Sequence, residues 1–90
     1  MTSNDPRWQR LGEIIVERRL ALGWTQVKFS IAAGVSTMVI SDMENGRRAD
    51  YQIATLVKVQ NALGWATGSI QDILAGGNPT ERTSPTTRPA

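Results

Sequence analysis

The stretch TQVKFSIAAGVSTMVISDMENG, residues 25–46, decides the fold. Thr25 and Ser36 are residue types that cap helix N-termini, and apolar residues with helical spacing follow each of them. Gly34 lies in the short connection between the two expected helices and permits the positive φ that a sharp turn requires. Because the connection is so short, the two helices must cross steeply. We call residues 25–45 the reading unit.

Both helices of the reading unit carry apolar residues at the positions that two crossing helices turn toward each other. Ser30 is small where the helices approach most closely, and a bulkier side chain there would push them apart. The inward positions are Phe29, Ala33, Val35, Ile40 and Met43.

The rest of the chain predicts three further helices, so the fold class is all-α. Glycines follow successive apolar runs with helical spacing, at roughly regular stops, which is typical of helix C-termini. Residues 77–90 are polar and rich in proline and threonine, and we expect a disordered tail or linker there, after a folded domain over residues 1–76. The further helices are expected over 6–22, capped by Asp5; over 51–63, capped by Asp50; and over 69–75, capped by Thr67 or Ser69.

The composition excludes several classes of function. The chain has no histidine and no cysteine, which removes the commonest general base and the usual ligands of structural metal sites. We therefore expect no enzyme, no catalytic residues, no metal and no cofactor. The net charge of +2 is compatible with a polyanion partner without requiring one. No apolar run is long enough for a membrane span or signal peptide, so the cytoplasm, at the nucleoid, is the expected location.

The pattern TQ…AGVS…IS.MENG resembles the xenobiotic-response-element family of helix-turn-helix proteins, which includes the Cro and repressor proteins of temperate phages. The resemblance covers roughly residues 7–76. It implies a five-helix domain like that of the lambda repressor, which binds double-stranded DNA, commonly as a dimer, with its third helix in the major groove.

The outward face of that third helix is the expected site of base recognition. The family resemblance assigns base contacts to Thr37, Met38 and Asp42, and Ser41 lies beside them. Met38 and the Thr37 methyl group suit a thymine methyl, whereas a carboxylate accepts only and suits a cytosine amino group. The alternative interpretation is a merely solvated surface.

Several residues at the edges of the reading unit suit contacts to the DNA backbone. Gln26 begins the first helix of the unit, where free backbone amides favour anions. In the family a glutamine at this position contacts the DNA backbone. Each of these residues could instead be an ordinary solvated side chain. The full set is Gln26, Lys28, Asn45, Arg47 and Arg48.

Arg19 lies on the apolar face of the expected first helix, where a charge needs a partner. The family pairs the positions that match Arg19 and Glu44. We therefore expect a partly buried ion pair between them, which makes Glu44 a structural residue.

Two features of the sequence do not decide whether their residues contact a second copy of the chain. Gln60 stands where the family has a small apolar residue, within the apolar stripe Ile53, Leu56, Val57 and Leu63, and requires either a local hydrogen-bonding partner or a subunit contact. Apolar residues near the last helix either close the core or form a homodimer surface. These are Trp65, Ile70, Ile73 and Leu74.

The sequence therefore predicts a bacterial or phage transcriptional repressor that binds a palindromic operator as a homodimer. Few cationic residues lie in the reading unit, so one copy would bind weakly and two linked copies would restore affinity. Two alternatives remain: an antitoxin that also binds a toxin protein, and a protein-interaction module that has kept the fold.

Overall fold

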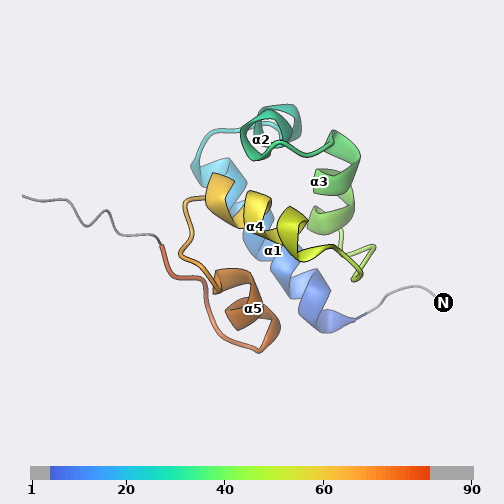
Figure 1. Cartoon of the computed structure of the whole chain (residues 1–90), viewed down its shortest axis with the longest axis vertical. Coiled ribbons are helices and arrows are strands. Elements are labelled where there is room, and N and C mark those ends of the chain that lie inside the picture. The colour runs from blue at the N-terminus through green and yellow to red at the C-terminus, as the bar shows by residue number, and fades with distance from the viewer. Residues whose placement is uncertain (1–4, 82–90) are drawn as a thin grey trace, which may run out of the picture.

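The computed structural model describes residues 5–81, which form five helices around one core (Figure 1). Within these residues there is no strand, and Trp65 and Glu81 form an isolated antiparallel bridge. No helix in this range is long and apolar enough to cross a membrane. The predicted all-α, five-helix fold is confirmed. The helices are α1 (Pro6–Ala21), α2 (Gln26–Ala33), α3 (Thr37–Glu44), α4 (Ile53–Ala62) and α5 (Ser69–Leu74).

The first three helices begin at the caps that the sequence predicts. At each start a side-chain oxygen accepts a hydrogen bond from a backbone N–H that has no partner within the helix. The oxygens belong to Asp5, Thr25 and Ser36, and the bonds measure 3.0, 3.0 and 3.1 Å. Pro6 occupies the first turn of α1, where its missing N–H removes no helical bond.

The fourth helix begins later than predicted and without the predicted cap. We expect a start at Tyr51 after Asp50, whereas α4 begins at Ile53, and its N-cap Gln52 makes no side-chain cap bond. The ring of Tyr51 packs against Trp8 of α1 instead, with centroids 5.7 Å apart. Burial of a large ring outweighs a local capping signal of about 1 kcal/mol.

The N-terminus of the fifth helix is capped by Gln60, a side chain from α4, because its own N-cap residue makes no side-chain hydrogen bond. The N-cap of α5 is Gly68, in the left-handed region at φ +89°, rather than the predicted Thr67 or Ser69. The Oε1 of Gln60 accepts the N–H of Ile70 at 3.2 Å, and Gln60 is 3% exposed. The buried glutamine thus has its hydrogen-bonding partner within the same chain, on the neighbouring helix.

Apolar side chains from all five helices meet in the core. In α4 the inward residues are Leu56 and Val59, whereas Ile53 and Val57 of the predicted stripe are 71% and 40% exposed. That part of the prediction is wrong, because the helix turns these two side chains to solvent. The buried apolar residues are Leu11, Ile15, Phe29, Ala33, Ile40, Met43, Leu56, Val59, Leu63, Trp65, Ile70 and Ile73.

The dimer surface suggested near the last helix is not available. Trp65, Ile70 and Ile73 are exposed by 2%, 0% and 1%, and Leu74 packs against the core. Side chains that are buried within one copy cannot also cover a second copy. Of the two interpretations, core closure is therefore the one that the structure supports.

The predicted tail begins too early. Residues 77–81 fold back beside the loop between α4 and α5 (Figure 1). The N–H of Ala66 donates to the carbonyl of Thr80 at 2.7 Å, and Ser69 exchanges two hydrogen bonds of 3.1 Å with the backbone of Thr80. All three bonds use main-chain groups of Thr80, so the side-chain composition of residues 77–81 could not predict them. Residues 82–90 of the predicted tail lie outside the described residues.

Gly12 determines how closely α1 approaches α3. A Cβ at this position would lie 2.5 Å from the carbonyl oxygen of Glu44 and 2.6 Å from that of Met43. Only a residue without a side chain permits this approach of helix to backbone. The contact places the end of α3 directly against α1.

Candidate nucleic-acid interface

The turn between α2 and α3 has the tight geometry that its sequence predicts. Gly34 adopts φ +76°, and the N–H groups of Gly34 and Val35 both donate to the carbonyl of Ser30, at 2.9 and 3.1 Å. The hydroxyl of Ser30 donates to the carbonyl of Val27 at 2.7 Å and accepts from Thr37 at 3.3 Å. The serine thus bonds to both helices where they meet.

One face of α3 packs inward and the opposite face is open. Ile40 and Met43 are buried in the core. Thr37 and Met38 are exposed, Met38 by 72%. Ser41 and Asp42, the other two predicted base-reading residues, are half-buried. All four therefore lie on the same short helix, with its N-terminal pair the most accessible.

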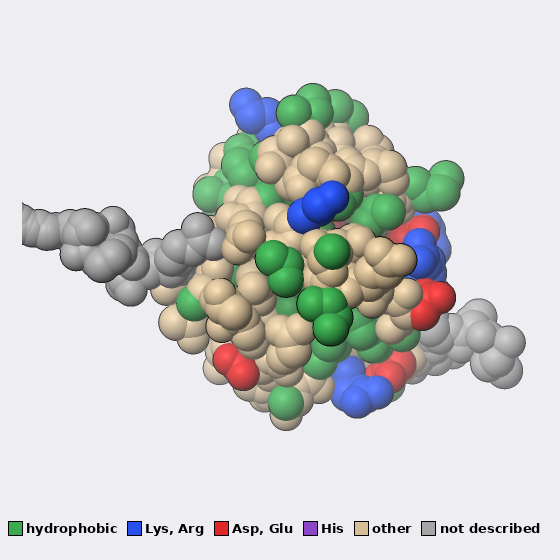
Figure 2. Space-filling model, in the orientation of Figure 1, with side chains coloured by type: hydrophobic (Ala, Val, Ile, Leu, Met, Phe, Trp, Pro, Cys, Tyr) green, Lys and Arg blue, Asp and Glu red, His purple; other side chains and the backbone are tan. Residues whose placement is uncertain are grey.

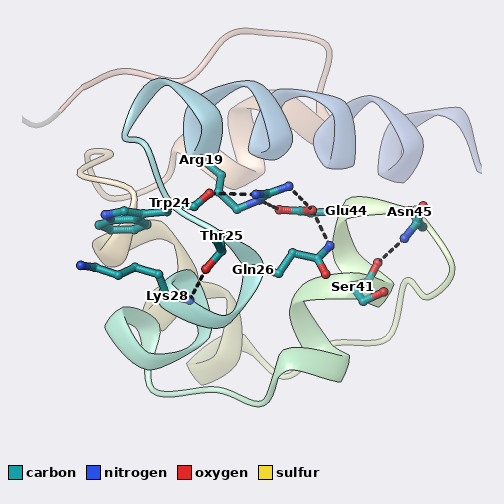
Figure 3. A network of polar contacts seen from close by, with 8 residues as sticks. All are labelled: Arg19, Trp24, Thr25, Gln26, Lys28, Ser41, Glu44 and Asn45. Carbon is teal, nitrogen blue, oxygen red and sulfur yellow. Dashed lines mark hydrogen bonds and ion pairs between the residues drawn. The ribbon is translucent and has the colours of Figure 1, made fainter.

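Arg19 and Glu44 form an ion pair that joins α1 to the end of α3 (Figure 3). Arg19 Nε lies 2.6 Å from Glu44 Oε2 and Nη2 lies 3.2 Å from Oε1, so the contact is bidentate. The side chains are exposed by only 14% and 3%. Arg19 also donates to the carbonyl of Trp24 at 2.9 Å. The arginine therefore fixes three segments of chain at once.

Gln26 belongs to the same network (Figure 3). Its Nε2 donates to Glu44 Oε1 at 2.8 Å, so Glu44 accepts from both Arg19 and Gln26. An amide group has two N–H donors, and the contact with Glu44 uses one of them. Glu44 thereby orients the side chain of Gln26 at the N-terminus of α2, a role that the sequence does not predict.

The end of α3 makes a Schellman turn that brings Arg47 over the helix. The N–H of Arg47 donates to the carbonyl of Asp42 at 2.9 Å, and Gly46 takes φ +65°. The guanidinium then reaches Asp42 Oδ1 at 3.0 Å and Ser41 Oγ at 3.4 Å. Asn45 is exposed, and its amide donates to the carbonyl of Ser41 at 2.8 Å.

Arg48 lies in the loop after α3 and is held on two sides. Its Nε donates to Asp50 Oδ1 at 3.2 Å, and its guanidinium carbon lies 4.7 Å from the centroid of the Tyr51 ring. Burial raises the pKa of Tyr51 to about 12. The hydroxyl of Tyr51 is buried, and no partner for it is found within residues 5–81. Asp50 and Tyr51 are neighbours of the interface that the sequence does not single out.

Lys28 completes the set of predicted backbone contacts. It is exposed on α2, and its backbone N–H is used by the Thr25 cap while its ammonium group faces solvent (Figure 3). Across residues 5–81 no three carboxylates gather in a way that could hold a metal ion. The structure therefore brings the predicted contact residues onto α2, α3 and the loop that follows, and it groups no metal ligands in the described part of the chain.

Comparison with known proteins agrees with this geometry. Residues 15–64, more than half of the chain, match the sequence profile of the family described as Helix-turn-helix. No curated protein matches the chain. The solved structure of ClgR, the clp gene regulator from C. glutamicum, is 27% identical with a TM-score of 0.64, covering 79% of this chain and 90% of ClgR.

Two restriction-modification controller proteins share the fold. C.AhdI from Aeromonas hydrophila is 22% identical with a TM-score of 0.60, covering 64% of this chain and 86% of its own. C.Esp1396I is 20% identical with a TM-score of 0.63, covering 78% of this chain and 90% of its own. The matched profile spans α2, α3 and the turn between them. This chain therefore belongs to the xenobiotic-response-element type of the helix-turn-helix family.

Proposed function

We propose that the protein is a sequence-specific, double-stranded DNA-binding regulator of transcription that represses a bacterial or phage gene. The observation that carries the proposal is the open face of α3, whose inward side is anchored in the core while Thr37 and Met38 project into solvent. A helix presented in this way fits the major groove. Its place of action would be the cytoplasm, where the bacterial chromosome lies.

The contacts divide into base recognition and backbone binding. Met38 and the methyl group of Thr37 pack against thymine methyl groups, and Asp42 accepts from a cytosine amino group, with Ser41 beside it. The free N–H of the Gln26 amide and the backbone amides of α2 bind a phosphate. The remaining phosphate contacts come from Lys28, Asn45, Arg47 and Arg48.

The protein acts as a homodimer, and the exposed face of α4 is the surface that supports this inference. Apolar side chains gather over α4 in Figure 2, with few charged side chains around them. Ile53 and Val57 border a shallow groove, and none of the residues that line it is charged. An uncharged groove can meet its own copy across a two-fold axis without like-charge repulsion between its lining residues. The lining residues are Ile53, Leu56, Val57, Gln60, Thr67, Gly68 and Gln71.

Selection of bound sequences from a random pool of duplex DNA tests the proposal. We expect an inverted repeat whose half-sites lie about one helical turn apart, as a dimer requires. Met38→Ala should then weaken operator binding by about tenfold, because it removes an apolar contact to a base, and the loss of recognition at one base pair typically costs roughly 1–3 kcal/mol. Leu20→Ala is the matched control, since Leu20 is an exposed apolar residue on α1.

The competing interpretation is a protein-interaction module that has kept the fold. It predicts no binding to any duplex DNA at low ionic strength, and this result would refute the proposed function. An antitoxin would bind its operator and, in addition, form a stable complex with a protein encoded beside it.

A further inference from the structure

Both arginines of the candidate interface are already paired with carboxylates of the same chain. Arg47 lies 3.0 Å from Asp42, and Arg48 lies 3.2 Å from Asp50. The proposed function brings both arginines, together with Lys28, against phosphates. An aspartate of this protein and a phosphate of the DNA would therefore bind to the same guanidinium group.

The pair of Arg47 with Asp42 is built by the backbone. The Schellman turn bonds the N–H of Arg47 to the carbonyl of Asp42, so the two side chains start from adjacent points. Gly46 is the turn residue, and a Cβ there would meet Gln9 of α1 at 3.0 Å, which keeps the turn against the first helix. The side chain of Asp42 is only 16% exposed, whereas that of Arg47 is 57% exposed, so the arginine is the more accessible member of the pair.

The pair of Arg48 with Asp50 is more open, with side chains 45% and 83% exposed. The ring of Tyr51 lies on the other side of the guanidinium and limits its range. A surface pair of this kind contributes little to folding stability. Its effect on a polyanion partner is larger, because the aspartate both occupies the arginine and repels the phosphate.

We propose that Asp42 and Asp50 compete with DNA phosphate for Arg47 and Arg48, and so weaken binding to DNA of unrelated sequence. The inference rests on the proposed function. On any duplex, a phosphate must either displace the aspartate from each arginine or share the guanidinium with a carboxylate that repels it. On the operator, Asp42 gains a cytosine amino group when Arg47 leaves, so the exchange is offset there and nowhere else.

Asp50→Asn is the direct test, because Asp50 is not assigned a base contact. Binding is measured to a duplex of unrelated sequence and to the selected operator over a series of salt concentrations. The amide keeps the shape and removes the charge. We expect binding to the unrelated duplex to tighten by about two- to fivefold, and the salt dependence to steepen by up to about 0.9 in log–log slope, one phosphate contact.

Two comparisons separate pairing from a general change of charge. Asp72→Asn changes the net charge equally but lies on α5, and it should leave both the affinity and the slope close to those of the native protein. In an Arg48→Gln background, Asp50→Asn should tighten binding less than in the native background, because only the direct repulsion between Asp50 and the phosphate is then removed. Equal tightening in both backgrounds, or none in the native background, overturns the inference.

Asp42→Asn gives a different signature. It should tighten binding to the unrelated duplex in the same way, while the preference for the operator falls by about tenfold or more. If the native protein binds its operator and neither aspartate variant binds unrelated DNA more tightly, only this inference fails. If the native protein binds no duplex, the proposed function fails with it.

Discussion

Replacing Gly12 by alanine should destabilise the protein, although helix propensity alone predicts the opposite. Gly12 lies in the interior of α1, where alanine is favoured over glycine by about 1 kcal/mol. The new Cβ would lie 2.5 Å from the carbonyl oxygen of Glu44, whereas ordinary contact begins at 3.4 Å, so the two segments must separate by about 0.9 Å. The clash is with main chain, which no side-chain rotation relieves.

The expected magnitude follows from these opposing terms. Overpacking of a core contact costs typically about 1–3 kcal/mol, and here it also displaces Glu44 from its bidentate contact with Arg19, which favours the upper end. After the gain in helix propensity, we expect a net loss of about 1–2 kcal/mol in the free energy of unfolding. For a domain of this size, this lowers Tm by roughly 5–15 °C.

Urea unfolding followed by circular dichroism measures the change, with thermal unfolding as a second observable. Glu13→Ala is the matched control, because Glu13 is the next residue of the same helix and is exposed. It should change stability by no more than about 0.5 kcal/mol. If Gly12→Ala proves as stable as the native protein or more so, the close approach of α1 to the end of α3 is refuted.

Three further predictions concern buried polar groups. Glu44→Ala should lower the free energy of unfolding by about 3–5 kcal/mol, since Arg19 stays buried without its carboxylate. A variant with native stability and native affinity for DNA would contradict this prediction. Gln60→Leu should cost about 1–3 kcal/mol in urea unfolding, because the N–H of Ile70 loses its acceptor, whereas an unchanged midpoint would show that the bond is unimportant. Tyr51 is the only tyrosine, so its ultraviolet titration should centre near pH 12 in the folded protein and near 10 in urea. Because its folded pKa is raised, stability should fall as the pH rises from about 10 to 12, and a folded-state midpoint near 10 would refute its burial.

The reading unit could be predicted from local sequence because its determinants are local. Thr25 and Ser36 satisfy backbone groups within one turn of themselves, and Gly34 adopts its positive φ for reasons confined to the turn. The ion pair of Arg19 with Glu44 could be predicted on different grounds. Arg19 is a charge on an apolar helix face, and the family resemblance pairs the two matching positions.

Features that join segments distant in the sequence were not predictable. The start of α4 depends on Tyr51 packing against Trp8, and the cap of α5 comes from Gln60 on another helix. Both are tertiary contacts, in which the partner's identity is not encoded near the residue that needs it. The choice between core and dimer surface for the apolar residues near the last helix stayed open for the same reason, since apolar character alone does not distinguish a core from an interface.

The amino-acid sequence by itself determined that this protein has two short crossing helices with a defined inner and outer face, because caps, turn residues and helical periodicity act over a few residues. Only the tertiary structure decided which apolar residues are left exposed, on α4 rather than α5, and which carboxylates hold Arg47 and Arg48. Those outcomes depend on the packing of helices against one another, which no local pattern specifies.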